Sequence, residues 1–377
     1  MPSLLPVPNP STWAPFDPVT AARLRADVAG AVAFHTARPY FSASQSSVQT
    51  VTTSTWTGVT LDNAAVDTAG GHSNTASPSR YVCKVAGWYL AVGTVAFASH
   101  ATALSNTYIA GVRVNGSNSF GNLFEGAKHP GANTHAIAPM VVELVQLAVG
   151  DYIELAAYQN SGGSVSTNSS SSGTPTINYS SQLSLTWVAS ATGTAGLPVP
   201  SEATWTDGIV VTSAALNSNI RDAVRFLTYP PIARIYYNGV TPAAQALPNN
   251  AFTTVSFDGA TVDNYGGWGG TGTNPTRWTA PVSGHYLVAG YSAVTASFTG
   301  KRAVGLKVNG TSNFFGQYFA AVAASGHGAG TSNLAIRLLK LNAADYVEVQ
   351  GFQSSGASSA LSTGNNTCRL IAVWMCA

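Results

Sequence analysis

The chain reads Trp278-Thr279-Ala280-Pro281-Val282-Ser283-Gly284-His285-Tyr286-Leu287 in its second half, where aromatic and β-branched residues flank a Pro-Val-Ser-Gly break. Alternation of this kind on either side of turn residues predicts two strands joined by a short turn. The first half contains a similar stretch, Arg80-Tyr81-Val82-Cys83-Lys84-Val85-Ala86-Gly87-Trp88-Tyr89. The same strand entry therefore occurs twice in one chain.

Further pairs of matching segments show that a whole domain is duplicated at a spacing of about 190 residues. The matching pairs are Thr12-Trp13 with Thr204-Trp205, Val112 to Gly116 with Leu306 to Gly310, Asp151 to Glu154 with Asp345 to Glu348, and Trp187 with Trp374. We divide the chain into a Pro-rich segment and helix (1–41), a first sandwich (42–190), a linker and second helix (191–231), and a second sandwich (232–377).

Each copy begins with a helical pattern. Apolar residues recur at helical spacing, with Thr20 and Thr212 as N-caps and Pro39 and Pro230 beyond the ends. The stripes include Leu24 and Val28 in the first helix and Leu216 and Ile220 in the second. Two interpretations stay open: each helix closes one end of its own sandwich, or it forms a seam where helices from several chains meet.

After each helix the pattern alternates, as expected for strands. The clearest predicted strands are 88–96, 108–114, 139–147 and 152–158, with counterparts at 286–294, 303–308, 334–341 and 346–352. The Asn-Gly pairs at 115–116 and 309–310 favour type I′ hairpins. Many short strands separated by turns predict an all-β chain of two tandem jelly-roll sandwiches. The Ser-rich stretches 161–173 and 354–366 are interpreted as exposed loops that could contact a partner.

The composition narrows the classes of function. Only 8% of residues are charged and the net charge is +2, with no basic cluster, so we expect no nucleic-acid partner. No segment is apolar for long enough to cross a membrane, and residues 1–10 lack the pattern of a signal peptide. Cys83, Cys368 and Cys376 have neither the spacing of a metal site nor that of a redox pair, and we expect buried, reduced thiols.

The second copy resembles C1q/tumour-necrosis-factor-like domains. The resemblance is carried by Phe257-Asp258, Asp263-Asn264, the stretch from Trp278 to Leu287, the strand entry at 341–349 and the closing strand at 370–374. The first copy is similar, with Leu61-Asp62 in place of Phe-Asp. No collagen-like repeat is present. The resemblance implies C1q-like jelly rolls that form a homotrimer.

A shorter resemblance concerns the lead-in to the second helix. Trp205-Thr206-Asp207-Gly208 and the helix that ends at Phe226-Leu227 are similar to segments of virion proteins from phages of actinobacteria. This implies a virion structural protein, such as a head fibre, decoration or minor tail component, assembled in the host cytoplasm. Its implied partners are further copies of itself, other virion proteins and host surface glycans. The rival hypothesis is a secreted or surface carbohydrate-binding protein of a bacterium.

No catalytic constellation is found. A Gly-x-Ser-x-Gly elbow and a His-Glu-x-x-His motif are both missing, so we expect no enzyme, no cofactor and no metal. Glu125, His129 and His135 lie among loop residues, and Asp258 with Asp263 is the pair to examine for calcium. Tyr265 and Trp268 lie in a Gly-rich run and are the candidate ligand contacts, since aromatic rings stack on sugars; packing against the sandwich is the alternative.

Overall fold

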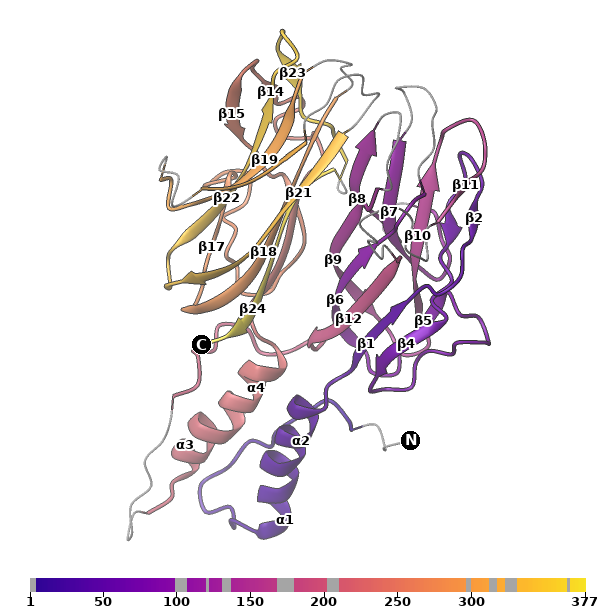
Figure 1. Cartoon of the computed structure of the whole chain (residues 1–377). Helices are drawn as coiled ribbons and strands as arrows, with labels where there is room; N and C mark the ends of the chain where they lie inside the picture. The colour runs from indigo at the N-terminus through magenta and orange to yellow at the C-terminus, as the bar shows by residue number, and fades with distance from the viewer. Residues whose placement is uncertain are drawn as a thin grey trace.

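The computed structural model contains two β-sandwiches above two helices that lie side by side (Figure 1). It describes residues 5–98, 107–119, 122–130, 137–167, 180–201, 210–295, 300–311, 317–322, 331–364 and 367–377. The expected all-β class, with two tandem jelly rolls each preceded by a short helix, is confirmed. No described helix is long and apolar enough to span a membrane.

Both helices begin at the predicted caps. Thr20 accepts a hydrogen bond from the Arg23 N–H, and Thr212 does the same for the Ala215 N–H. Each helix has a central turn of π-helix. The segments of the first helix are α1 (Ala21–Leu24), η1 (Arg25–Ala29) and α2 (Gly30–Thr36), and those of the second are α3 (Ser213–Leu216), η2 (Asn217–Asp222) and α4 (Ala223–Thr228).

The first sandwich consists of two main sheets. Its inner sheet has the strand order β4-β1-β12-β6-β9, and its outer sheet has the order β3-β10-β7-β8 with β5 paired to β10. A small sheet, β11-β2, lies at one end. The strands are β1 (Tyr40–Ser44), β2 (Thr50–Val51), β3 (Thr57–Gly58), β4 (Asn63–Asp67), β5 (Arg80–Val82), β6 (Gly87–Thr94), β7 (Thr107–Val114), β8 (Leu123–Pro130), β9 (Met140–Leu147), β10 (Tyr152–Gln159), β11 (Val165–Ser166) and β12 (Gln182–Ala189).

The second sandwich repeats this topology strand for strand. Its inner sheet is β16-β13-β24-β18-β21, its outer sheet is β15-β22-β19-β20 with β17 paired to β22, and its small sheet is β14-β23. The strands are β13 (Ile232–Tyr237), β14 (Ala246–Leu247), β15 (Ala251–Thr254), β16 (Gly259–Asp263), β17 (Arg277–Thr279), β18 (Gly284–Val294), β19 (Arg302–Val308), β20 (Gln317–Val322), β21 (Thr331–Leu341), β22 (Tyr346–Gln353), β23 (Ser359–Ala360) and β24 (Cys368–Cys376).

Each sandwich has its own apolar core between its two sheets. Phe34 of the first helix lies in the first core and contacts the Trp187 ring edge-on, at 4.9 Å between ring centroids. Phe226 of the second helix contacts Trp374 in the same way, also at 4.9 Å. Each helix therefore closes the end of its own sandwich, which confirms the first of the two interpretations.

The segments that precede the helices also dock on these cores. Leu5 and Val7 pack against the first core, and Leu197 and Val199 pack against the second. Both pairs lie in the same motif, Leu-Pro-Val-Pro, at 5–8 and 197–200. Proline fixes an extended backbone that projects alternate side chains to one side. This pair of motifs belongs to the repeat, but sequence reasoning did not identify it.

Two expectations need correction. Asn115 and Asn309 do take positive φ, at 53° and 52°, and each turn closes as a type I′ turn would. However, the turn after β7 is followed by further residues before β8 begins at Leu123, so it is not a two-residue hairpin. Cys83 and Cys368 are buried and reduced as expected, whereas Cys376 is exposed because β24 runs out of the sheet at its end.

Candidate functional site: the interface between the two sandwiches

The two inner sheets meet in an apolar interface between the sandwiches. Buried side chains from both sheets form one cluster, made of Trp88, Leu90, Val142, Leu144, Val188 and Ala189 from the first sandwich, and Ile232, Ala289, Tyr291, Ile371 and Val373 from the second. At about 25 cal/mol per Å² of buried apolar surface, such a cluster holds the sandwiches together. The pair forms one unit, with β8 of the first sandwich beside β21 of the second (Figure 1).

A buried ion triad lies within this interface. Glu143 on β9 faces Arg234 on β13 and Arg369 on β24, and the side chains are 0%, 1% and 0% exposed. Glu143 Oε1 lies 2.6 Å from Arg234 Nε, and Glu143 Oε2 lies 3.0 Å from Arg369 Nε. Arg234 Nη2 donates a second hydrogen bond, of 3.3 Å, to Glu143 Oε2. One carboxylate from the first sandwich thus binds two guanidinium groups of the second.

Further polar groups complete the site around the triad. Arg234 Nη1 donates to Thr261 Oγ1 at 2.9 Å, and Arg369 Nη2 donates to the Glu125 carbonyl at 2.8 Å. The Arg369 guanidinium lies 3.5 Å from the centre of the Tyr291 ring. Each charged group therefore has several partners, as a buried charge requires.

Tyr291 connects the triad to the backbone of β9. Its hydroxyl accepts a 2.7 Å hydrogen bond from the Val142 N–H and donates a 3.0 Å bond to the Val142 carbonyl. Burial raises the pKa of Tyr291 to about 12, so the hydroxyl stays protonated and can donate. These bonds use polar groups on the edge strand β9 that water would otherwise occupy.

The ionisation of Glu143 follows from opposing effects. Burial acts most strongly and would raise the pKa of its carboxyl, but Arg234 and then Arg369 lower it, and the net result is a pKa below the ordinary value. The carboxylate is therefore charged at neutral pH. Removing any one member of such a triad leaves a buried charge without compensation, which costs about 3–5 kcal/mol.

The edge and the face that meet here have counterparts in the other copy. Leu147 pairs with Gly87 and Leu341 pairs with Gly284, so Arg337 occupies in β21 the position of Glu143 in β9. By the register of the inner sheets, Ser42 corresponds to Arg234 and Gln182 to Arg369. The first sandwich therefore supplies the edge, and the second supplies the face.

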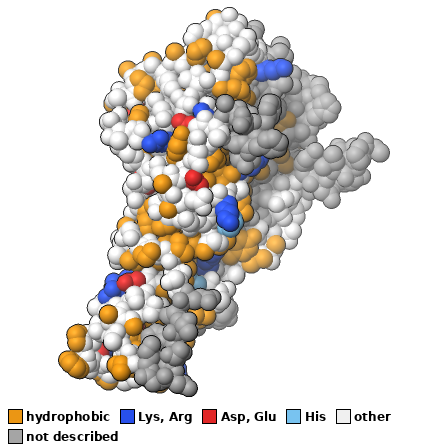
Figure 2. All heavy atoms as spheres, turned by 90° about the vertical axis from the view of Figure 1, so that its left-hand side faces the viewer, with side chains coloured by type: hydrophobic (Ala, Val, Ile, Leu, Met, Phe, Trp, Pro, Cys, Tyr) orange, Lys and Arg blue, Asp and Glu red, His pale blue; other side chains and the backbone are white. Residues whose placement is uncertain are grey.

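The surroundings of the two edges differ accordingly. Leu144 is 1% exposed in the docked edge, whereas its counterpart Leu338 is 62% exposed. Arg337 is exposed as well, and its Nη1 donates to the Ile336 carbonyl at 2.7 Å. Figure 2 shows isolated charged side chains among polar and hydrophobic ones on one side of the molecule. A single docking mode, used once, leaves the second edge uncovered.

A helical seam extends the interface below the sandwiches. Asn217 binds the backbone of Trp13 twice: its Oδ1 accepts from the Trp13 N–H at 2.8 Å, and its Nδ2 donates to the Trp13 carbonyl at 2.9 Å. Trp13 is 2% exposed, and Arg23 stacks over its ring at 3.9 Å. His35 Nε2 lies 3.3 Å from Thr228 Oγ1. The two helices of one chain therefore form a seam with each other.

The four predicted assembly residues divide between the two helices. In the second helix Leu216 is buried and Ile220 is half-buried, whereas in the first helix Leu24 is half-buried and Val28 is 37% exposed. Val32, one further turn along the first helix, is 58% exposed. The stripe on the second helix is covered within the chain, and the equivalent stripe on the first is open. Their role in assembly stays a prediction.

The candidate ligand contacts Tyr265 and Trp268 pack against the second core as half-buried side chains. Trp268 Nε1 donates to the Pro275 carbonyl at 3.3 Å, and burial raises the pKa of Tyr265 to about 12. Both rings therefore contact protein on at least one side, as in the packing alternative. Ligand contact by these residues stays a prediction.

The carboxylates considered for calcium serve as turn acceptors. Asp258 accepts from the N–H groups of Asn238, Val240 and Thr241. Asp263 accepts from Gly267 and Trp268 N–H groups and from Trp278 Nε1. Among the described residues, no group of three or more His, Cys, Asp or Glu side chains could hold a metal ion. His135 and much of the loop 161–173 lie outside the described residues, as does the side chain of His129.

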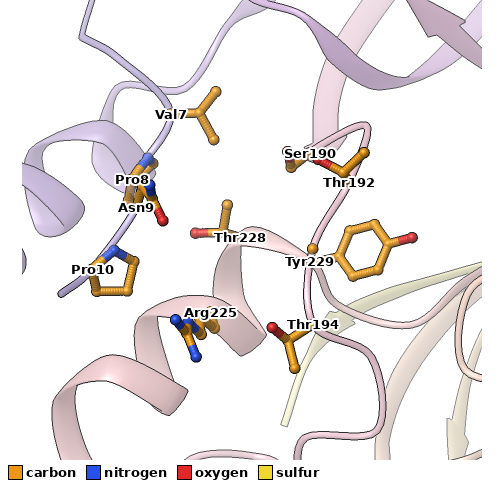
Figure 3. Close-up of a pocket in the computed structure, with 11 residues that line it drawn as sticks. Val7, Pro8, Asn9, Pro10, Ser190, Thr192, Thr194, Arg225, Thr228 and Tyr229 are labelled. Carbon is orange, nitrogen blue, oxygen red and sulfur yellow. The ribbon is translucent and has the colours of Figure 1, made fainter. Parts of the chain in front are cut away.

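A cavity of about 380 Å³ lies beside the helical seam (Figure 3). Its walls come from Val7 to Pro10, from residues 190–194 after β12, and from Arg225, Thr228 and Tyr229 at the end of the second helix. The Ser190 N–H donates to the Thr228 carbonyl at 2.8 Å and fixes one wall. The cavity is rich in hydroxyl groups, which suits water or another small polar molecule.

Sequence reasoning found neither the triad nor the seam. Glu143, Arg234 and Arg369 each lie in an otherwise apolar strand, and a charged residue within such a strand is the signal that could have found them. Aligning the two copies supplies a second signal, because Glu143 stands opposite Arg337 while the neighbouring positions stay apolar. Neither signal identifies the partner strand.

Comparisons with known proteins gave structural similarity only. No family model matches the chain, and no curated protein matches its sequence. Among solved structures, the globular domain of zebrafish complement 1qA protein is 10% identical, with a TM-score of 0.28, and the match covers 41% of this chain and 99% of that one. Murine APRIL is 12% identical, with a TM-score of 0.28 and coverage of 38% and 98%.

Proposed function

We propose that this protein is a structural, self-assembling component of a virion, a head fibre, decoration or minor tail protein, and that it works as a homotrimer. The observation that carries the self-assembly is the contrast between the two helices. The stripe Leu24, Val28 and Val32 is open, while its counterpart on the second helix is covered by packing within the chain. An open apolar stripe that continues an existing seam is a natural site for a second copy.

Low surface charge supports the same proposal. With 8% charged residues, the chain has few ions to solvate, and its exposed large hydrophobic residues include Val28, Val32, Leu227 and Leu338. Burial of these side chains between copies would remove them from water. The virion context rests on the resemblance of the lead-in to the second helix, which falls largely on residues outside the described ones.

The alternative is a carbohydrate-binding protein of a bacterial surface. The observation that favours it is the polar cavity beside Arg225, whose hydroxyl-rich walls suit a sugar. Glycan contact through Tyr265 and Trp268 belongs to either proposal, since a virion protein that binds host glycans would use the same chemistry.

Incorporation into particles tests the virion proposal. Particles assembled with a tagged copy should carry the tag at stoichiometric amounts after density-gradient purification. A Val28→Asp copy should be lost from the particles although it folds, because a carboxylate would interrupt the open stripe. Free tagged wild-type protein at the top of the gradient would contradict the proposal and favour the carbohydrate-binding alternative.

A further inference from the structure

The duplicated sandwiches allow four pairings of an edge with a face. The docking edge is the open side of a sandwich at the last inner strand, with Glu143 in the first copy and Arg337 in the second. The docking face is the outward surface of the inner sheet, with Arg234 and Arg369 in the second copy and Ser42 and Gln182 in the first. The observed pairing, first edge on second face, joins opposite charges.

The three other pairings leave the charges uncompensated. First edge on first face would bury Glu143 beside Ser42 and Gln182, which carry no charge. Second edge on second face would bring the Arg337 guanidinium against Arg234 and Arg369, which places three positive charges in a site without water. Second edge on first face would give Arg337 only neutral polar partners, because Ser42 is bonded to Ser184 across the sheet.

We propose that this one position of the edge decides which face the edge accepts: Glu143 directs the first edge to the second face, and Arg337 keeps the second edge off the second face of another copy. The partner that Arg337 rejects is a second copy of this chain. A ring in which second sandwiches from different copies meet edge on face is therefore excluded, although their fold is duplicated and the exposed Leu338 would otherwise favour it.

This inference concerns the choice of pairing and does not rest on the proposed function. It also restricts that function, because copies must then associate through another surface, such as the open helical stripe. The two cores are separate clusters, so a sandwich keeps its own core when the interface opens. Edge variants of the full chain therefore test the pairing without unfolding either sandwich.

A capture experiment tests the charge code. Glu143→Arg should open the interface and expose the Arg234 and Arg369 face, and Arg337→Glu should create an acidic second edge on an intact chain. Tagged Arg337→Glu protein should capture Glu143→Arg protein several-fold more than tagged wild-type protein does. Lys340→Glu is the matched control, since it makes the same change of charge on the same strand at another exposed position and should capture no more than wild type.

Two further results complete the test. Adding Arg234→Glu and Arg369→Glu to the Glu143→Arg chain should abolish the extra capture and close its own interface again with reversed charges. Circular dichroism of each variant should retain the strand signal of the wild type. Equal capture by the Arg337→Glu, Lys340→Glu and wild-type chains would overturn the inference. Association of all chains at one baseline level, or of none, would bear on the homotrimer alone, because the comparison between variants is made above that baseline.

Discussion

Glu143 Oε1 and Arg234 Nε lie 2.6 Å apart, although the residues are 91 positions apart in the chain and belong to different sandwiches. Both side chains are almost completely buried. Two sandwiches with separate cores are thereby held in one relative position by a charged pair that neither contains alone. The interface has the properties of a domain core, with an apolar cluster and satisfied polar groups.

Neutralising the carboxylate should open this interface. We expect Glu143→Gln to destabilise the docked pair by about 3–5 kcal/mol, because two buried guanidinium groups lose their counter-ion. Denaturant unfolding should then change from one transition to two, one for each sandwich. Lys307→Gln, which affects a partly exposed ion pair with Glu348, is the control and should cost about 1 kcal/mol or less. A single unchanged transition for Glu143→Gln would show that the triad does not hold the sandwiches together.

The helical seam should weaken in mild acid through His35. Burial, and then the nearby Arg38, lower the pKa of His35 from 6.5 to about 4. A group whose pKa is depressed on folding binds fewer protons when folded, so its contribution is complete above pH 6.5 and is lost as pH falls towards 4. The melting temperature should decline in that window, and the decline should be smaller in His35→Gln. An identical pH profile for the two proteins would exclude His35 as the cause.

The two helical stripes should respond differently to the same substitution. Leu216→Asp places a carboxylate at a site that is 5% exposed, so it should lower the melting temperature and impair folding or docking of the helix. Val28→Asp, at a site that is 37% exposed, should leave the melting temperature of the isolated chain within a few degrees. A harmless Leu216→Asp would show that this stripe is not a buried contact.

Trp268 separates packing from recognition. Trp268→Ala removes one hydrogen bond and a half-buried ring, so we expect a loss of stability of about 1–3 kcal/mol with the fold retained. If glycan contact holds, binding to cell-wall glycans should fall as well, and Phe252→Ala, which removes an exposed ring elsewhere on the same sandwich, should bind as the wild type does. Normal adsorption by Trp268→Ala would leave this residue with a packing role only.

The fold could be predicted much further than the site. Strand alternation, the caps at Thr20 and Thr212, and the duplication depend on residues close in sequence, and these expectations agree with the structure within a few residues. The triad could not be predicted, since it depends on which strands of two sandwiches meet. Cys376 was misplaced because an apolar strand can continue past the edge of its sheet, and no local pattern marks where coverage ends.

Light scattering of the purified full-length chain at micromolar concentration tests the central claim, self-assembly, most directly. We expect a particle of three times the mass of one chain, and a Val28→Asp chain that has the mass of one. A wild-type chain that stays monomeric across that concentration range would contradict the account.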